Sequence, residues 1–313
     1  IENSPNIDGV EVYHPRFITF PKSSLTYITG YTYWWAIKRL IDKLYKEFKF
    51  DLIHAHTALP DGFAAICIAK RYEKPIIVTI HGQDFRETIF RDRKCKKNIE
   101  KVISFSDKTV VVSNKLKRLG EESLKVSPNK MIVISNGIDS NEVFKKRSDL
   151  LKQYKNRKVI LSVSNLVKTK GIDLNLKAIA QLKRKYPRIC YLIIGEGKER
   201  KKLEKLMRDL NLQNIVRFLG ELPHQKVMEF MSICDIFSLP SWNEAFGVVY
   251  IEAMAHGKPV IGCKKEGIED IVEDGKSGLL LSPRNINELT QALERLLLDK
   301  NFAKKIGENG RRI

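Results

Sequence analysis

The stretch DIFSLPSWNEAFGVVYIEAMAHGKPVI, residues 235–261, is the most informative part of the sequence for predicting the fold class. The stretch begins with a short apolar run at 235–238, which is typical of a strand. A polar loop, a segment of helical period at 248–256 and a second apolar run at 259–261 follow it. Apolar strands that alternate with helices indicate a parallel sheet covered on both faces. This stretch therefore predicts an α/β fold.

The same alternation extends outward from this stretch in both directions. Further strands are expected at residues 51–54, 75–80, 108–112, 131–134, 158–163, 190–194 and 215–219. Further helices are expected at residues 33–48, 174–186, 198–210 and 287–298. A polar, lysine-rich stretch at 140–157 predicts a domain boundary. We therefore expect two Rossmann-like domains, residues 1–140 and 141–313, that face a cleft and bind ligands at the carboxyl ends of their strands.

Composition narrows the class of protein. The 313 residues include 56 basic and 37 acidic side chains, and the resulting net charge of +19 favours phosphate-bearing partners. An apolar content of 43% excludes a disordered chain, and no apolar run reaches the ~18–20 residues that span a bilayer. Five cysteines without a C-x-x-C pair argue against a disulfide framework and favour a reducing, cytoplasmic compartment.

Two glutamates in the quoted stretch are candidates for binding a polar ligand. Glu244 lies in the loop after a strand, whereas Glu252 lies inside the following helix. Eight residues of helix rise ~12 Å, while paired glycosidase carboxylates lie ~5–9.5 Å apart. Separate roles are therefore favoured over one shared reaction, although two surface glutamates remain the alternative. The amides of Phe246, Gly247 and Val248 at the helix start suit a phosphate or a sugar.

Two other loops follow expected strands in the second half. Gly195 and Gly197 precede a basic helix, but Arg200 replaces the third glycine of a dinucleotide fingerprint, so a plain strand–helix turn is equally compatible. The helix start could still bind a phosphate. Lys170 lies just before an expected helix and is placed to neutralise a diphosphate, with an ordinary surface lysine as the alternative.

Histidines end two neighbouring strands of the first half. His54 and His56 share one strand, and a metal pair would need a third or fourth ligand that the surrounding sequence does not offer. We therefore expect no metal, and a capping or packing role for His54. His81 is expected to contact a ligand, with His56, Gln83 and Asp84 on the same side of the expected cleft.

Together these residues resemble the retaining glycosyltransferases of family four, the group-one enzymes with the GT-B fold. The resemblance covers roughly residues 50 to 300. It is carried by Glu244-x7-Glu252, residues 252–261, Lys170-Gly171, Gly195-Glu196-Gly197, and residues 78–82, 135–139 and 218–220. It implies transfer of a sugar from a nucleotide-diphosphate sugar, with UDP favoured over GDP, to an acceptor hydroxyl. It also implies no metal, no other cofactor and no covalent nucleophile.

The resemblance implies a role for each matching residue. Glu252 would hold the ribose, Glu244 the hydroxyls of the donor sugar, and His81 would lie against the transferred sugar. Lys170 would neutralise the diphosphate together with the amides of residues 246–248. The nucleotide pocket would be lined by Asn165, Gly195, Gly197 and Leu222. Many members have Gly-Arg where this chain has Ser164-Asn165, so Asn165 offers a hydrogen bond but no charge.

The first half departs from the family pattern at its start. The chain begins with Ile1 instead of Met, and the family's opening strand and glycine-rich loop are not found. We therefore expect a truncated N-terminal domain.

The acceptor is predicted from the basic, aromatic segment at residues 27–50. Its helix suits either packing on the sheet or an anionic membrane surface. We expect a glycan or lipid-linked acceptor of cell-envelope polysaccharide synthesis, as in the teichuronic-acid-type enzymes that the first half resembles, and a peripheral position on the inner face of the membrane. The alternatives are a GT-B-like epimerase or phosphorylase, or an inactive nucleotide-sugar-binding module. Nucleic acid is not expected as a partner, because no recognised motif accompanies the charge.

Overall fold

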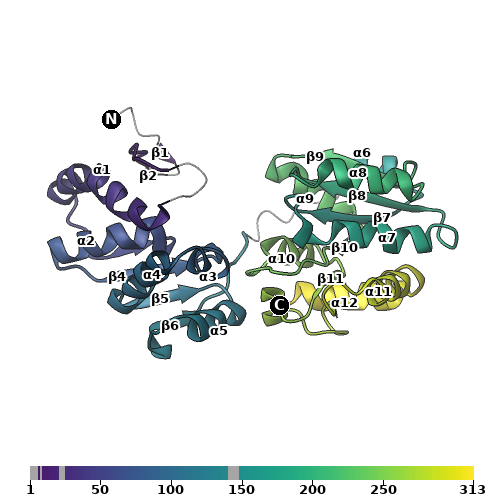
Figure 1. The fold of residues 1–313 in the computed structure, drawn as a ribbon. Coiled ribbons are helices and arrows are strands. Elements are labelled where there is room, and N and C mark those ends of the chain that lie inside the picture. The colour runs from purple at the N-terminus through teal and green to yellow at the C-terminus, as the bar shows by residue number, and fades with distance from the viewer. Residues whose placement is uncertain (1–5, 8, 21–24, 140–147) are drawn as a thin grey trace. The chain divides into compact units, whose positions relative to one another are not determined.

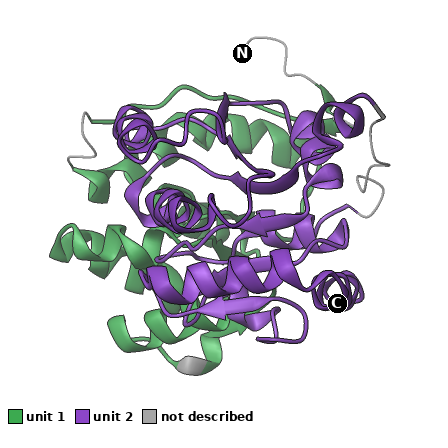
Figure 2. Cartoon of the chain, turned by 90° about the vertical axis from the view of Figure 1, so that its right-hand side faces the viewer, with its two compact units in different colours: residues 1–135 green, residues 136–313 purple. Residues whose placement is uncertain are grey.

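The computed structural model describes residues 6–7, 9–20, 25–139 and 148–313 (Figure 1). The chain divides into two compact units, residues 1–135 and 136–313 (Figure 2). Part of the expected linker, residues 140–147, lies outside the described residues. The next part is helix α6 (Ser148–Tyr154), where the sequence had indicated a polar connection. The difference arises because Leu150, Leu151, Lys152 and Gln153, the central residues of this helix, all have high helix propensity.

The first unit contains a parallel sheet with the strand order β3-β4-β5-β6. These strands are β3 (Ile53–Ala55), β4 (Ile76–Ile80), β5 (Lys108–Val111) and β6 (Met131–Val133), and a separate antiparallel pair is formed by β1 (Asn6–Ile7) and β2 (Val10–Glu11). The helices are α1 (Thr26–Glu47), α2 (Phe63–Tyr72), α3 (Gln83–Arg86), α4 (Arg93–Phe105) and α5 (Asn114–Ser123). Helix α4 begins at Asp92, whose side chain accepts a hydrogen bond from the Cys95 amide at 2.8 Å and so satisfies one orphan donor.

Helix α1 begins earlier than expected and packs against α2. It starts at Thr26 instead of residue 33, and its buried Ile37 packs against Ala64 and Ile68 of α2. The apolar stripe of α1 therefore packs mainly on α2, and Ile53 of β3 belongs to the same hydrophobic cluster. Trp35 lies off this stripe and is 74% exposed.

The second unit contains a six-stranded parallel sheet with the order β12-β11-β10-β7-β8-β9. Its strands are β7 (Lys158–Val163), β8 (Ile189–Ile194), β9 (Val216–Gly220), β10 (Ile236–Ser238), β11 (Val260–Cys263) and β12 (Leu279–Leu281). Its helices after α6 are α7 (Ile172–Leu182), α8 (Arg200–Asp209), α9 (His224–Ile233), α10 (Val248–Ala255), α11 (Ile286–Leu298) and α12 (Lys300–Arg311). Every expected strand of the chain is found within two residues at each end, whereas β1, β2 and β12 were missed by sequence reasoning.

The strand order creates a switch point in the second sheet. The chain runs from β7 to β8 and β9 on one side, and then returns to β10 on the other side of β7. The loops that leave the carboxyl ends of β7 and β10 lie next to each other at this point. Such a point is where α/β sheets bind ligands.

A buried polar network joins the strands at this point. The side-chain amide of Asn175, in α7, donates to the Tyr191 hydroxyl at 3.0 Å and to the Ser238 carbonyl at 3.0 Å. The Ser238 hydroxyl donates to Asn175 Oδ1 at 2.7 Å. Ser162 Oγ lies 2.8 Å from the Tyr191 hydroxyl. The network links β7, β8, β10 and α7, and thereby holds the ends of β7 and β10 in register.

Candidate functional site

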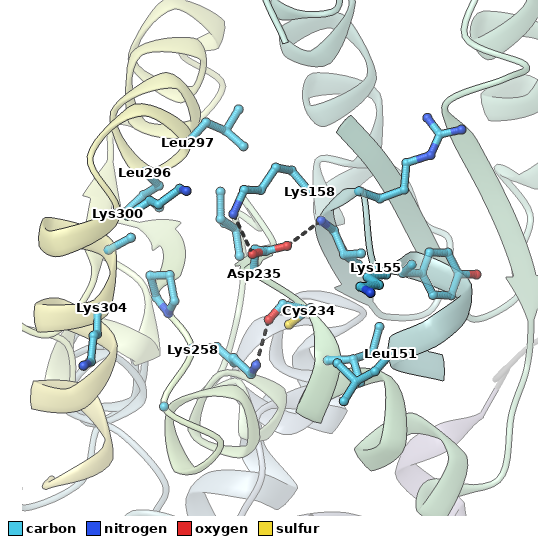
Figure 3. A pocket seen from close by; sticks show the side chains of 18 residues that line it. Leu151, Lys155, Lys158, Cys234, Asp235, Lys258, Leu296, Leu297, Lys300 and Lys304 are labelled. Carbon is cyan, nitrogen blue, oxygen red and sulfur yellow. Dashed lines mark hydrogen bonds and ion pairs between the residues drawn. The ribbon is translucent and has the colours of Figure 1, made fainter. Parts of the chain in front are cut away.

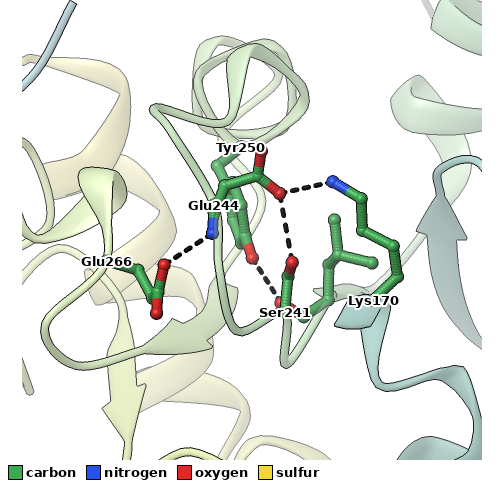
Figure 4. A network of polar contacts seen from close by, with 6 residues as sticks. Lys170, Ser241, Glu244, Tyr250 and Glu266 are labelled. Atoms are coloured by element: carbon green, nitrogen blue, oxygen red, sulfur yellow. Dashed lines mark hydrogen bonds and ion pairs between the residues drawn. The ribbon is translucent and has the colours of Figure 1, made fainter. Parts of the chain in front are cut away.

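Lys170 and Glu244 meet at the switch point of the second unit (Figure 4). Lys170 Nζ lies 2.5 Å from Glu244 Oε2, and Ser241 Oγ donates to the same oxygen at 3.1 Å. The backbone amide of Glu244 donates to Glu266 Oε2 at 2.6 Å. The Lys170 and Glu244 side chains are 23% and 13% exposed, so the pair is partly shielded from water. The structure therefore places a cation and a carboxylate side by side where a diphosphate sugar is expected.

The loops that carry this pair are locked together through their backbones. The Trp242 amide donates to the Thr169 carbonyl at 2.8 Å. Gly171 has a φ of +68°, and a Cβ at this position would lie 2.4 Å from the Pro240 carbonyl oxygen. Only glycine permits this close approach. The Lys170-Gly171 pair thus has a structural reason in addition to the charge it supplies.

Helix α10 begins at a glycine beside the ion pair. Gly247 is its N-cap residue, with a φ of +93°, and it offers no side-chain oxygen to the first-turn amides. Helix α7 begins in the same way at Gly171. Such helix starts suit an anion. Val248 is the first residue of α10, and the Phe246 side chain is buried in the protein interior, so Phe246 can offer a ligand its backbone only.

Glu252 lies on α10 with its carboxylate largely buried. Its Oε1 is 2.9 Å from Nε2 of His224, and its backbone oxygen is 2.8 Å from Nδ1 of His256. Burial lowers the pKa of His256. Among the described residues, no hydrogen bond or ion pair joins Glu252 to Glu244 or Lys170. The two glutamates of the motif therefore have different partners.

Gly195 and Gly197 are required by the packing of two loops. Their φ angles are +125° and +159°, and added Cβ atoms would lie 2.0 Å from the Ser164 oxygen and 2.5 Å from the Leu166 oxygen. Asn165, between those two residues, is exposed. Leu222 is partly buried against the hydrophobic core. This packing explains both glycines, and the nucleotide contacts of these positions stay a prediction.

In the first unit, the predicted histidines form a small cluster at the carboxyl ends of β3 and β4. His56 Nδ1 lies 3.0 Å from His81 Nε2, and the two rings are stacked with centroids 5.3 Å apart. His54 Nε2 lies 2.8 Å from the Thr79 hydroxyl. Burial, followed by the neighbouring imidazoles, lowers the pKa values of His54 and His81. Within the described ranges, no group of histidine, cysteine and acidic side chains is arranged to hold a metal ion.

Gln83 and Asp84 differ in their surroundings. Gln83 is exposed at the start of α3, and its contact with a ligand stays a prediction. Asp84 is only 3% exposed, and its carboxylate accepts from the backbone amides of Ala58 at 3.2 Å and Leu59 at 3.3 Å. Burial raises the pKa of Asp84 to about 6, against the opposing effect of these hydrogen bonds. Asp84 therefore holds the loop after β3, and its expected position on the acceptor side stays a prediction.

Three residues of the site were missed by sequence reasoning: Ser241, Glu266 and His224. Glu266 follows β11 as Glu244 follows β10, so the rule that loops after parallel strands carry ligand contacts could have found it. No comparable signal marks His224, because its contact with Glu252 depends on how α9 packs beside α10.

Two family models match this chain, each over a different part of it. Residues 143–313 match the family described as Glycosyl transferases group 1, and residues 3–142 match Glycosyltransferase Family 4. An uncharacterized glycosyltransferase, MJ1178 of Methanocaldococcus jannaschii, is 33% identical over 83% of this chain and 69% of its own length. N-acetyl-alpha-D-glucosaminyl L-malate synthase of Bacillus anthracis is 30% identical over the same shares.

The fold is also similar to solved structures. The structure of Anabaena Alr3699/HepE in complex with UDP has a TM-score of 0.79 at 23% identity, over 88% of this chain and 76% of that one. In the described part of the chain, no helix is both long and apolar enough to cross a membrane. Because family matches span both units and relatives reach 30% identity or more, the chain belongs to the group 1 glycosyl transferases, the enzymes of glycosyltransferase family 4.

Proposed function

We propose that this protein transfers a sugar, with retention of anomeric configuration, from a UDP-sugar to a hydroxyl of a glycan or lipid-linked acceptor in cell-envelope polysaccharide synthesis. The observation that carries the proposal is the Lys170–Glu244 pair beside the glycine-capped start of α10. A cation and free helix-start amides suit a diphosphate, and an adjacent carboxylate suits the hydroxyls of a sugar.

Each group has a distinct part in donor binding. Lys170 and the amides of residues 247–248 stabilise the negative charge that grows on the diphosphate as it leaves. Glu252 accepts hydrogen bonds from the ribose, a contact that a buried carboxylate makes strongly because few waters compete for it. Glu244 orients the transferred sugar through its free Oε1 side, while Oε2 bonds Lys170 and Ser241.

In the transfer step, the bond between the anomeric carbon and the diphosphate oxygen breaks, and its electron pair leaves with the diphosphate. The acceptor oxygen forms the new bond on the same face of the sugar, and its proton passes to the departing diphosphate oxygen. In this step His81 lies against the transferred sugar, and it takes no part in nucleotide binding. Its imidazole is mainly neutral at pH 7 because burial lowers its pKa.

The surface of helix α1 supports the proposal of a lipid-linked acceptor. Trp35 is largely exposed, and Lys38 Nζ lies 4.8 Å from the centroid of its ring. Exposed aromatic and cationic side chains on one helix suit the headgroup region of an anionic membrane. A peripheral position on the inner face of the membrane would bring the enzyme to a lipid-linked acceptor.

The test combines binding with product analysis. Calorimetry with UDP, GDP and ADP should show UDP as the tightest of the three. Incubation with UDP-sugars and lipid-linked or glycan acceptors should then give a product whose anomeric configuration, read by NMR, equals that of the donor. The His81→Ala variant should lose transfer while its UDP affinity stays within about twofold of the parent.

Three results would count against the proposal. Turnover of UDP-sugar without any acceptor would favour an epimerase, and phosphate-dependent turnover a phosphorylase. UDP binding without transfer to any acceptor class would favour an inactive binding module. An inverted product would exclude retention.

A further inference from the structure

A second concave site lies at the opposite edge of the sheet from Lys170 and Glu244. A cavity of about 390 Å³ opens at the amino ends of β7, β10 and β11, whereas Lys170 and Glu244 follow the carboxyl ends of β7 and β10 (Figure 3). Helices α6, α11 and α12 complete its walls. We call this cavity the basal pocket. Its volume lies in the range of small-molecule sites.

The basal pocket is far more basic than the chain as a whole. Of its 18 lining residues one is acidic, Asp235, and six are basic: Lys155, Arg157, Lys158, Lys258, Lys300 and Lys304. The whole chain has 56 basic and 37 acidic residues, so the general excess of lysine does not explain this ratio. Figure 3 shows Lys300 and Lys304 on one side of the pocket and Lys155 on the other, with Lys158 and Asp235 between them.

Two of the six cations already have structural partners. Lys158 Nζ pairs with Asp235 Oδ1 at 3.1 Å. The buried Lys258 donates to the carbonyls of Ser232 at 2.8 Å and Cys234 at 2.7 Å, at the end of α9, where the helix dipole favours a cation. These contacts account for Lys158 and Lys258 without any ligand.

The other four cations are not neutralised in this way. Lys304 faces Glu308 at 3.7 Å, and both side chains are well exposed, so this pair is weak. In the ranges that the structure describes, no ion pair involves Lys155, Arg157 or Lys300. Lys300 is the first residue of α12, whose start is capped by Asp299, because the Asp299 carboxylate accepts from the Phe302 amide at 2.8 Å. Four like charges around one cavity repel one another, and a bound anion would relieve that repulsion.

The remaining walls are apolar. Leu151, Tyr154, Ile233, Leu296 and Leu297 line the cavity beside the cations. Such a combination matches a molecule with one charged end and a less polar ring or chain. We propose that the basal pocket binds a small phosphate ester such as a sugar phosphate, with Lys155, Arg157, Lys300 and Lys304 around the phosphate and the apolar wall against the rest.

The experiment measures binding of glucose 6-phosphate, with inorganic phosphate and unphosphorylated glucose as comparators, by calorimetry at low salt. We expect glucose 6-phosphate to bind more tightly than either comparator. A variant in which the four exposed cations become glutamine (Lys155→Gln, Arg157→Gln, Lys300→Gln, Lys304→Gln) should weaken glucose 6-phosphate binding at least about tenfold, as expected for loss of several charge-assisted hydrogen bonds. All four side chains are on the surface, so the thermal unfolding temperature should change little.

Two controls separate this site from general charge and from the donor site. The first removes the same number and type of charges from exposed positions elsewhere, as Lys97→Gln, Lys201→Gln, Lys205→Gln and Arg208→Gln. The second is Lys170→Ala. Both should keep parental affinity for glucose 6-phosphate within about twofold.

Three outcomes would overturn the proposal. The parent protein could fail to bind glucose 6-phosphate, or the first control could lose as much affinity for it as the four-cation variant. A loss of affinity for glucose 6-phosphate in Lys170→Ala would place the binding at the donor site. A lipid headgroup is the competing source of phosphate. Binding to phosphatidylglycerol vesicles that depends on the four cations, without binding of the free ester, would exclude the small-molecule assignment. The proposal does not depend on sugar transfer, because the experiment measures only binding and thermal unfolding.

Discussion

Lys170 Nζ and Glu244 Oε2 lie 2.5 Å apart, although 74 positions of sequence separate the two residues. The diphosphate cation and the sugar-binding carboxylate of the proposed donor site are thus each other's partners. A bound diphosphate would compete with Glu244 for Lys170. Removing Lys170 and removing Glu244 should therefore change the affinity for UDP in opposite directions.

Removing the cation should weaken UDP binding. In Lys170→Ala we expect a loss of about 1.5–3 kcal/mol in UDP affinity by calorimetry, with uridine binding unchanged, because the lost interaction is with the diphosphate. Lys168→Ala, an exposed lysine in the same 3-10 turn, is the control. A Lys170→Ala variant that binds UDP like the parent would leave Lys170 without this role.

Removing the competing carboxylate should have the reverse effect on binding. Glu244→Gln keeps the shape of the side chain but frees Lys170, so UDP should bind more tightly by roughly 1 kcal/mol while sugar transfer falls. Glu221→Gln, at an exposed position after β9, should change neither quantity. Weaker UDP binding in Glu244→Gln would show that the ion pair supports the diphosphate site instead of competing with it.

Glu252 is expected to hold the ribose. Glu252→Ala should weaken UDP binding by roughly 1.5–3 kcal/mol, and Glu252→Gln by less, because the amide keeps one acceptor. Pyrophosphate has no ribose, so its affinity should be the same in all three proteins. The assignment fails if calorimetry gives equal UDP affinities for the parent and Glu252→Ala.

Substitution of Gly195 tests whether the packing of two loops explains the glycines at positions 195 and 197. Gly195→Ala should destabilise the second unit by more than about 1 kcal/mol beyond the cost of the positive φ, because its Cβ would lie 2.0 Å from the Ser164 oxygen. Gly275→Ala is the matched control, since Gly275 has a φ of +76° and nothing within 4 Å of an added Cβ. Equal unfolding temperatures for the two variants would contradict the packing argument.

Asp84 makes the first unit sensitive to pH. Its pKa is about 6 in the folded protein and 3.8 as an ordinary carboxyl, so the unfolded state releases its proton first as the pH rises. The contribution of Asp84 to stability is therefore largest below pH 3.8, falls between pH 3.8 and about 6, and is constant above that. The total change is about 3 kcal/mol, from a shift of about two units.

Carboxyl NMR of aspartate-labelled protein should show a resonance that titrates near pH 6 and is missing in Asp84→Asn. Asp51→Asn, at an exposed carboxyl, should retain that resonance. A spectrum in which every aspartate titrates near pH 4 would contradict the burial argument.

Membrane attachment through α1 should depend on Trp35. We expect binding to anionic vesicles at low salt, weaker binding at 0.15 M salt, where the screening length is about 8 Å, and a further loss in Trp35→Ala. Phe90→Ala removes another well exposed aromatic side chain and should bind like the parent. Vesicle binding that is equal in Trp35→Ala and the parent would exclude this surface.

Most strands, the fold class and the family could be predicted from the amino-acid sequence alone. Runs such as 158–163 are apolar on both faces, and a strand buried on both sides of a parallel sheet needs that local pattern. Gly171 and Gly195 could be located as turns from sequence, since left-handed backbone favours glycine wherever it occurs. The spacing from Glu244 to Glu252 was enough to separate their expected roles.

The side chains that meet in the site could not be predicted from sequence and are known from the folded structure. The strand order around β7 brings Lys170 to Glu244, and the packing of the loop after β11 brings Glu266 to the Glu244 amide. The loop after β3 folds over Asp84 and donates two backbone hydrogen bonds to its carboxylate. The basal pocket likewise gathers residues from 151 to 304. Local sequence encodes propensity and periodicity, whereas contacts between distant residues depend on how whole elements pack, because burial and electrostatic pairing act through space and not along the chain.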